Sequence, residues 1–272
     1  MSGSGTIPLF LYHYTSLDSL RLIVTNRTIR FTRSDRLNDL NEGSIRIKTM
    51  DDNLDFRIAT SFYSSWTSQE EESVAMWYMY SKMQGVRIKL RYDMFLDKGS
   101  IILEDNDKHV RPVTPIKGIP IKTFPNSECT ISKVLGPIGI VYEKNSEIID
   151  KRVAQKSVVK NGGNSEYVMN DIDLLEKQIR KTVYWEYEKE YRYIIAPYIA
   201  VHCDDDALRL NVALDPECPP CIDIPIFKPI EEVLLAPQIT EEDKVEITSF
   251  LTENGITNIR ESSVKCSFDK CF

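Results

Sequence analysis

The sequence predicts an α+β protein in which many short strands are accompanied by a few peripheral helices. Several segments alternate apolar and polar residues with the period of a strand, most clearly 86–92, which reads VRIKLRY. Fewer segments show the apolar spacing of an amphipathic helix. No Pro- or Gly-rich linker clearly divides the 272 residues. We therefore expect a single domain over 1–272, with an irregular insertion around 98–165.

The first third of the chain is expected to alternate strands with helices. Strands are predicted at 9–12, 28–32, 56–63 and 86–92. A first helix follows residue 16, with Ser16 or Asp18 as its cap. The loop 36–43 is expected to open into a polar helix. A further helix over 74–83 follows a run of glutamates that suits the positive end of its dipole, and Gly85 ends it.

The remainder is expected to hold fewer regular elements. Strands are predicted at 139–142, 185–199 and 232–236, with strand or loop at 222–230 and a strand-like end at 258–265. The segment 161–166 is predicted to be a turn or a mobile loop. An amphipathic helix is expected at 168–183, because its apolar residues recur on one side. Thr240 and the acidic residues after it predict a capped helix over 243–254.

Composition narrows the class of protein. The formal net charge is −7, which argues against indiscriminate binding to nucleic acid. No apolar run approaches the roughly 20 residues that span a bilayer, and the N-terminal segment lacks the pattern of a secretory signal. The six cysteines are therefore expected to be reduced thiols in a cytoplasmic protein without a membrane partner.

Five arginines gather between residues 21 and 36, at positions 21, 27, 30, 33 and 36, with one acidic residue among them. Such a segment could meet a polyanion or the pyrophosphate of a dinucleotide. It could equally form a solvated surface.

His13 follows an apolar, aromatic run and begins a polar cluster with Tyr14, Thr15 and Ser16. A polar cluster where a strand meets a helix is a common place for a ligand. The alternative is an ordinary half-buried histidine.

The run 186–192 places a glutamate at every second residue. On a strand, Glu186, Glu188 and Glu190 would share one face, and Arg192 would continue it. Carboxylates in a row repel one another unless they are solvated or meet a cation. They therefore predict either a solvent-facing edge strand or a cleft in which a carboxylate stabilises developing positive charge.

The helix expected at 74–83 is dense in aromatic residues. Trp77 and Tyr80 share a face, and with Tyr63 they could stack on a flat cationic ring. Residues of this kind are also the usual filling of a core.

A zinc site is a rival interpretation of the cysteines. Cys218 and Cys221 form a CxxC motif, and His202 and Cys203 lie upstream. The spacing is irregular and a second CxxC is missing, so free thiols are the main expectation and no metal is assigned.

Five blocks resemble an uncharacterised bacterial domain family of unknown function. They are LYHYTS at 11–16, the segment 31–42 with its Asn-Asp pair, 75–90 with its MWYMY run, WEYEKEYRYII at 185–195 and IEEVLLAP at 230–237. That family in turn looks distantly similar to ADP-ribosyltransferases, including bacterial toxins that modify nucleic acid. The resemblance implies a split β-sandwich core with peripheral helices and a His-Tyr-Glu constellation that binds NAD.

The resemblance also implies roles for individual residues. Glu190 and Glu188 match a Glu-x-Glu pair and would be catalytic together with His13. His13 and Thr15 match an HxT motif that would hold NAD, with Tyr14 between them. The other residues expected around NAD are Arg30, Arg33, Tyr63, Trp77 and Tyr80. The acceptor would meet Arg36, Asn38, Asp39 and Glu42. The segment 60–65 differs from the Ser-Thr-Ser strand of arginine-modifying members, and Leu40 stands where the domain family prefers proline.

The expected function is therefore an NAD-dependent ADP-ribosyltransferase of the cytoplasm, in a toxin or phage-defence setting with a possible antitoxin partner. RNA is favoured over DNA or protein as acceptor, because the arginines at 21–36 could receive a phosphate backbone. The alternative is a non-catalytic module that binds a nucleotide or a protein in stress or defence. A zinc-stabilised structural protein is a third possibility.

Overall fold

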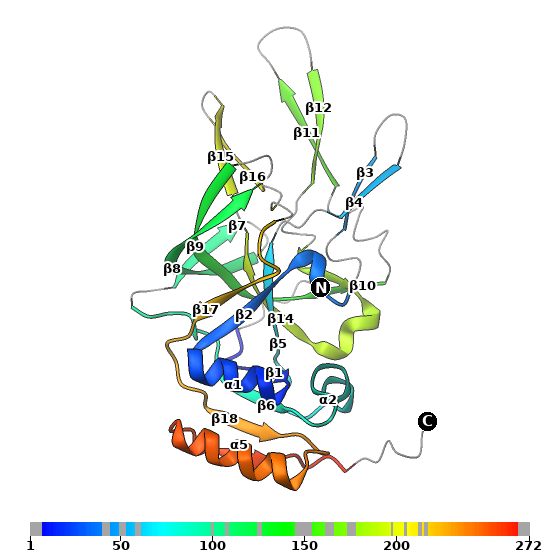
Figure 1. Cartoon of the computed structure of the whole chain (residues 1–272). Coiled ribbons are helices and arrows are strands. Elements are labelled where there is room, and N and C mark those ends of the chain that lie inside the picture. Colours follow the sequence, from blue (N-terminus) through cyan, green and yellow to red (C-terminus); the bar gives the residue numbers. More distant parts are fainter. Residues whose placement is uncertain are drawn as a thin grey trace.

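The computed structural model describes most of the chain. The described residues are 7–39, 44–48, 53–57, 61–98, 101–106, 109–123, 127–144, 154–160, 166–172, 178–196, 198–203, 206–211, 214 and 217–265. They form a mixed α+β structure dominated by strands, as the sequence predicts (Figure 1). Within them no helix is long and apolar enough to cross a membrane.

An 11-stranded sheet organises the molecule. Its main path runs β19 (Ile259–Glu261), β18 (Glu232–Leu235), β6 (Val86–Arg91), β1 (Phe10–Thr15), β5 (Phe62–Thr67), β14 (Glu190–Ile195), β9 (Ser127–Gly139), β8 (His109–Thr123) and β7 (Ile102–Asn106). β2 (Thr28–Arg33) joins β5 from the side and carries β17 (Cys221–Pro225). The pairings are antiparallel except for β18 with β19, which α5 (Glu241–Glu253) connects.

The sheet branches at one edge of β5. β1 pairs with β6 over six positions, but it meets β5 only at Tyr12↔Thr67. β2 meets the other end of β5, at Thr32↔Tyr63 and Arg33↔Phe62. The intervening residues 64–66 pair with β14 on one side. Among the described strands, none pairs with 64–66 on the other side, so β1 and β2 diverge there and leave an opening.

The helices begin where short polar side chains cap them. Ser16 accepts a hydrogen bond from the backbone of Ser19 at the start of α1 (Leu17–Asn26), and Ser73 does the same for α2 (Val74–Ser81). Thr240 caps α5, as the sequence predicts. In Figure 1, α5 lies beside β18 at the lower end of the molecule and α2 lies beside β1. Two short 3-10 helices, η1 (Ser34–Arg36) and η2 (Val183–Glu188), complete the set in the described residues.

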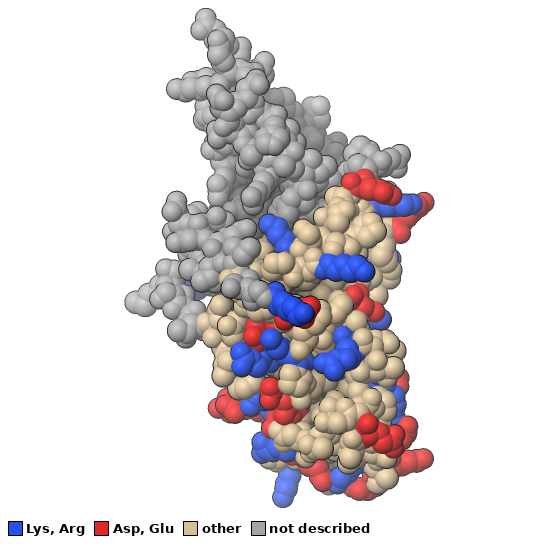
Figure 2. Space-filling view, turned by 90° about the vertical axis from the view of Figure 1, so that its left-hand side faces the viewer, with Lys and Arg blue, Asp and Glu red and all other residues tan. Residues whose placement is uncertain are grey.

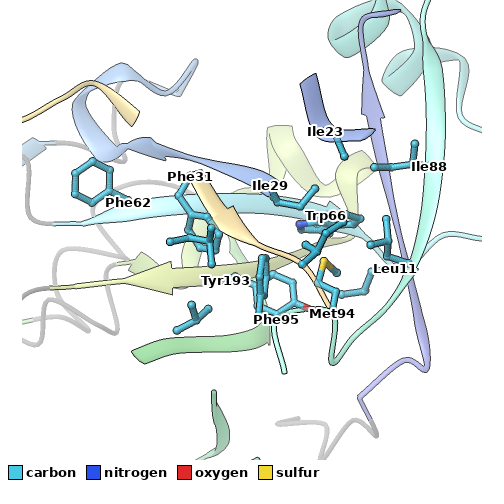
Figure 3. Close-up of a cluster of buried hydrophobic side chains, with 14 of the residues drawn as sticks. Leu11, Ile23, Ile29, Phe31, Phe62, Trp66, Ile88, Met94, Phe95 and Tyr193 are labelled. Carbon is cyan, nitrogen blue, oxygen red and sulfur yellow. The ribbon is translucent and has the colours of Figure 1, made fainter. Parts of the chain in front are cut away.

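The main core is built from buried residues of the large sheet, including β1, β2, β5, β6, β14 and β18, together with α1 and α5. Figure 3 shows Phe31, Phe95 and Tyr193 packed together, with Phe62 at one end of the cluster and Trp66 and Leu11 toward the other. The rings of Phe95 and Tyr193 meet edge to face with centroids 4.9 Å apart. Most of these side chains are almost fully buried, so the strands β1, β2, β5 and β14 are fixed relative to one another.

Small sheets lie outside the main one. β3 (Ser44–Lys48) pairs with β4 (Asn53–Arg57), β11 (Ala154–Lys160) with β12 (Glu166–Ile172), and β15 (Tyr198–Cys203) with β16 (Asp206–Asn211). β10 (Val141–Glu143) runs parallel to β13 (Arg180–Thr182).

Several predicted elements are wrong. The helix expected at 168–183 is wrong over 168–172 and 180–182, which form strand β12 up to Ile172 and strand β13, because each segment finds a strand partner. Residues 173–177 of that prediction lie outside the described residues, and Gln178 is helical. The strand expected at 185–199 begins as η2, and only 190–195 is β14. The polar helix after 36–43 is wrong over its described part, where β3 follows instead. The strand expected at 56–63 divides, since β4 ends at Arg57 and β5 begins at Phe62.

Other predictions are confirmed or shifted slightly. The strands at 9–12, 28–32, 86–92 and 232–236 correspond to β1, β2, β6 and β18. Much of the segment 98–165 forms strands β7 to β11 rather than irregular chain. The predicted turn at 161–166 lies outside the described residues except for Glu166, which begins β12.

Candidate functional site

A cavity of about 170 Å³ occupies the opening where β1 and β2 diverge from β5. Residues from seven parts of the chain line it: Tyr12, His13 and Tyr14 on β1, Arg30 and Thr32 on β2, Leu37 and Asn38 after η1, residues 63–67 on β5, Met76 and Tyr80 on α2, Lys181 on β13, and Glu188 and Glu190 around the start of β14. The segments furthest apart in sequence therefore meet at one place.

His13 bridges the gap between the diverging strands. Its Nδ1 lies 2.9 Å from the carbonyl oxygen of Ser65 on β5. A carbonyl can only accept, so Nδ1 carries the proton and the neutral ring presents Nε2 as an acceptor. The ring also lies against Trp66, with centroids 5.0 Å apart. Burial lowers the pKa of His13 below 6.5, and the bond to Ser65 opposes this shift.

Glu190 is held as a buried carboxylate. Its side chain accepts from Arg192 Nε at 2.9 Å and from Arg192 Nη2 at 3.0 Å, while Lys181 Nζ lies 2.9 Å from its Oε2. Burial by itself raises the pKa of a carboxyl, but the two cations outweigh it and lower the pKa of Glu190 to about 2. Glu190 is therefore ionised at neutral pH.

Glu188 has a different environment, although it is equally buried. Its Oε2 accepts from Lys181 Nζ at 2.7 Å, and its Oε1 accepts from the hydroxyl of Tyr80. Burial raises the pKa of Glu188, Lys181 opposes the rise, and the neighbouring charge of Glu190 adds to it. The two carboxylates of the pocket therefore differ in proton affinity.

The backbone at Lys189 explains how both glutamates reach the pocket. Lys189 adopts a left-handed conformation, with φ 42° and ψ 50°, between η2 and β14. Its N–H donates to the carbonyl of Glu186 at 3.2 Å, which closes the turn. The predicted shared strand face of Glu186, Glu188 and Glu190 is therefore wrong, because Glu186 is exposed and pairs with Lys189. The shared face of Glu190 and Arg192 is confirmed.

The aromatic candidates separate into two groups. Tyr80, Tyr63 and Tyr14 line the pocket. Trp77 does not: it is fully buried, packs edge to face against Tyr14 and donates from Nε1 to Glu72. Thr15 is buried and also lies outside the pocket lining.

The arginine cluster is largely paired with acids. Arg21 meets Glu246 at 2.6 Å, Arg30 meets Asp223 at 3.0 Å, and Arg33 meets Asp35 at 2.7 Å. Arg33 is buried and does not line the pocket, whereas Arg30 does. Arg36 is exposed and lies 3.9 Å from Asp35. On the face shown in Figure 2, basic and acidic side chains are interspersed rather than separated.

The loop expected to meet the acceptor is described only in part. Asn38 lines the pocket and donates to the Tyr80 hydroxyl at 3.3 Å. Asp39 is buried, its N–H donates to the Asn38 side chain at 3.0 Å, and it is not among the lining residues. Glu42 lies outside the described residues.

Sequence reasoning missed Lys181 and underestimated Arg192. Lys181 lies within the segment 168–183 that the sequence predicts to be helical, and no neighbouring residue marks it as a partner for residues seven and nine positions later. The contact of Arg192 with Glu190 is predictable from the sequence, because a basic residue two positions after a glutamate on a strand lies on the same face.

The described residues contain no group of three or more His, Cys, Asp or Glu side chains that could hold a metal ion. Cys218 is buried and Cys221 is half-buried, and neither belongs to a disulfide. The side chains of His202 and Cys203 lie outside the description.

Comparisons with protein-family models, with curated proteins and with solved structures find no match to this chain.

The chemistry of the pocket follows from its charges. Two carboxylates and two cations lie in contact, and they cancel if all are ionised. His13 and Glu188 offer acceptors to a ligand, while aromatic rings supply flat walls. The site suits a ring or sugar that carries hydroxyl or amide hydrogens.

Proposed function

We propose that the chain is an NAD-dependent ADP-ribosyltransferase with this pocket as its active site. The observation that carries the proposal is the meeting of His13, Tyr80, Glu188 and Glu190, from distant segments, in a single cavity at a split in the sheet. These residues occupy the positions that the resemblance assigns to a His-Tyr-Glu constellation. A split β-sandwich of the ADP-ribosyltransferase kind is part of the same proposal.

The pocket fits one end of NAD and not the whole molecule. Its volume of about 170 Å³ is below the roughly 300–1,000 Å³ of sites that enclose drug-sized ligands. Its acceptors and aromatic walls fit a ribose with its attached ring. Arg30 lines the same cavity, on the strand next to the opening, and would face the phosphates.

NAD supplies the ADP-ribosyl group when it is bound. His13 would accept a hydrogen bond from a ribose hydroxyl through Nε2, and Tyr80 would lie against the ring. The carboxylates would stabilise positive charge as the group is transferred and would take the proton of the acceptor.

The acceptor is proposed to be nucleic acid, with RNA first. The pairing of Arg21, Arg30 and Arg33 with acids reduces the basic surface available for a phosphate backbone. Arg36 is the most exposed of the paired arginines near the pocket and is the residue we propose for this contact.

The test is transfer of label from NAD. The purified chain would be incubated with labelled NAD and, separately, with total RNA, single-stranded DNA, double-stranded DNA or cell protein. We expect label on one polymer class with wild type and with Glu186→Gln, but not with Glu188→Gln or His13→Ala. Glu186 is the matched control because it belongs to the same run and is exposed. No label on any polymer, together with no NAD binding by calorimetry, would refute the proposal.

The proposed toxin or phage-defence setting has its own test. Wild type expressed in bacterial cells should arrest growth and Glu188→Gln should not, and a co-expressed antitoxin should restore growth. Equal growth of both strains would exclude a toxic activity under those conditions.

A second candidate function is a non-catalytic nucleotide-binding module. The observation that favours it is the neutralisation of Glu190 by Lys181 and Arg192, because a compensated carboxylate stabilises a cation less well than a free one. In that case NAD or another nucleotide should bind by calorimetry, with no label transferred and equal binding by Glu188→Gln.

A further inference from the structure

Ser64 is a buried serine on β5 that lines the pocket and is bonded on one side only. The residue is 3% exposed. Trp66 Nε1 donates to Ser64 Oγ at 3.0 Å. An indole N–H can only donate, so Ser64 is the acceptor in this bond and keeps its own hydroxyl proton to give. No acceptor for that proton is found among the residues that the structure describes, although buried polar hydrogens normally have one.

Trp66 fixes the place of the Ser64 oxygen and also touches His13. The indole is almost fully buried and lies on the same face of β5 as Ser64, two residues away. The His13 ring lies against it with centroids 5.0 Å apart. Because Nδ1 of His13 is bonded to the Ser65 carbonyl, its Nε2 is an acceptor. One indole therefore contacts both a hydroxyl donor and an imidazole acceptor of the pocket.

A donor and an acceptor that share a neighbour match the two adjacent hydroxyls of a ribose. One hydroxyl would donate to Nε2 of His13, and the oxygen of the next would accept from Oγ of Ser64. A site built to bond a substrate hydroxyl rejects the analogue that lacks it, because its own polar group is then left unpaired. The pair therefore selects a ribose over either deoxyribose.

Thr15 is the hydroxyl residue that the resemblance assigns to the ligand beside His13, but the structure places it elsewhere. Thr15 is buried at the end of β1, opposite Val86 on β6. It does not belong to the pocket lining, whereas Ser64 does. The role expected of Thr15 is therefore open to a residue of another strand.

The other hydroxyl residues of the lining lack the same support. They are Thr32, Ser65 and Thr67. Thr67 Oγ1 accepts from the N–H of Gln69 at 3.1 Å. Within the described residues, none of the three hydroxyls is bonded to Trp66 or His13.

We infer that Ser64 is a specificity-determining residue of the pocket, which donates a hydrogen bond to one hydroxyl of a nucleoside ribose while His13 accepts one from the neighbouring hydroxyl. The inference rests on the proposed function and deepens it, because it names the group of the ligand that the pocket selects. It also assigns to Ser64 the contact that the resemblance gives to Thr15.

The test is nucleoside binding, measured by NMR titration of the full chain, which needs neither transfer nor an acceptor. Adenosine and nicotinamide riboside represent the two ends of NAD. The one that binds is then compared with its 2′-deoxy and 3′-deoxy forms. Wild type should bind each deoxy form more weakly, by roughly five- to tenfold for each lost hydrogen bond.

Ser64→Ala should change this pattern in a specific way. The affinity for the ribose form should fall by roughly five- to tenfold. One deoxy form should then bind as well as the ribose form, because the hydroxyl that it lacks no longer has a partner. Discrimination against the other deoxy form, which depends on His13, should persist. A role confined to packing around Trp66 would weaken all three ligands by the same factor.

Ser81→Ala is the matched control. Ser81 is also a buried serine, but its hydroxyl already donates to the carbonyl of Trp77 at 2.7 Å and it does not line the pocket. This variant should bind all three ligands as wild type does.

The opposing outcomes are distinct. Failure of both nucleosides to bind, or equal binding of ribose and deoxyribose forms by wild type, would overturn the inference even if Ser64→Ala failed to fold. Loss of discrimination in Thr15→Val and not in Ser64→Ala would return the contact to Thr15. Absence of label transfer together with the expected discrimination would instead refute the proposed function and leave a ribose-binding pocket.

Discussion

At the scale of single residues, His13 shows how one hydrogen bond fixes both a tautomer and a strand separation. The Nδ1–H bond to Ser65 replaces the backbone pairing that β1 and β5 lack beyond Tyr12. The same bond directs Nε2 to act as an acceptor. The imidazole of His13 therefore makes a structural hydrogen bond through Nδ1 and offers a candidate ligand contact through Nε2.

Histidine NMR tests the state of this ring. We expect His13 to titrate below 6.5, because burial lowers its pKa, with His13→Gln assigning the signal among the three histidines. The folded pKa lies below the unfolded one, so the neutral ring contributes stability that is complete above pH 6.5. That contribution is lost as the pH falls from 6.5 through the folded pKa. Titration at or above 6.5 would show that burial does not outweigh the bond to Ser65.

At the scale of elements, Gly85 sets the approach of α2 to β1. A Cβ at this position would lie 2.1 Å from the carbonyl oxygen of Thr15 and 2.8 Å from Ser81 Cβ. Gly85→Ala should therefore lower stability by about 1–3 kcal/mol, measured by urea unfolding. Gly139→Ala is the control, because its new Cβ would meet Tyr191 at an ordinary 3.5 Å. Equal stability of the two variants would show that the turn after α2 can accommodate the added methyl group.

The segment after β19 is attached to α2 through Glu72. The carboxylate accepts from Trp77 Nε1 at 3.0 Å, from the Ser263 N–H and hydroxyl at 2.8 Å each, and from the Ser262 hydroxyl. Despite partial burial, these bonds lower the pKa of Glu72. The contact ties the C-terminal strand to the helix that carries Tyr80.

Glu72→Gln should loosen that attachment. The loss of charge and of one acceptor oxygen should cost about 1.5–3 kcal/mol in urea unfolding. It should also speed hydrogen exchange at 259–264 more than elsewhere. Glu71→Gln is the control, because Glu71 is exposed. A uniform change in exchange, or none, would show that Glu72 does not hold the strand.

The sequence correctly predicts those strands and helix caps that depend only on the local pattern of residues. β1, β2, β6 and β18 are apolar or alternating segments, and Ser16 and Thr240 cap their helices as expected. The helix predicted at 168–183 is wrong over 168–172 and 180–182, because its apolar spacing also suits strands and partners distant in sequence decide between the two. The glutamate run fails at Lys189, where a left-handed turn breaks the period of a strand.

The candidate site is also predictable where its residues belong to a local sequence pattern. His13, Tyr80, Glu188 and Glu190 carry visible patterns, and the structure brings all four into the pocket. The contact of Lys181 with the glutamates could not be predicted from the sequence. It depends on the parallel pairing of β10 with β13 and on the turn that follows β13. Trp77 shares its pattern with Tyr80, yet the packing of Tyr14 against it makes it a core residue.

At the scale of the whole molecule, the branched sheet brings an ionic cluster into the interior. Glu190 and Arg192 are buried within the main sheet, and Lys181 reaches them from the small sheet of β10 and β13. Breaking such a cluster on one side leaves an uncompensated charge, which typically costs about 3–5 kcal/mol. The stability of the molecule is therefore expected to depend on the ionisation of Glu190.

Acid unfolding tests this dependence by comparison with Glu190→Gln. The folded pKa of Glu190 is about 2 and its ordinary value is 4.5. The carboxylate therefore contributes stability, about 3 kcal/mol by this shift, that is present above pH 4.5 and lost as the pH falls toward 2. Glutamine resembles the protonated side chain, so the gap in unfolding free energy between wild type and Glu190→Gln should be widest at pH 7.

The gap should close as the pH falls from 4.5 to 2, because only wild type loses a buried charge there. The titration of His13 occurs in both proteins and largely cancels in the difference. The pKa of Glu188 is lower in Glu190→Gln, because the neighbouring charge is gone, so its titration is followed separately. Glu186→Gln should show a small gap that stays constant with pH, since its ion pair with Lys189 is exposed. A gap for Glu190→Gln that is equally constant would mean that Arg192 and Lys181 do not depend on the ionised carboxylate.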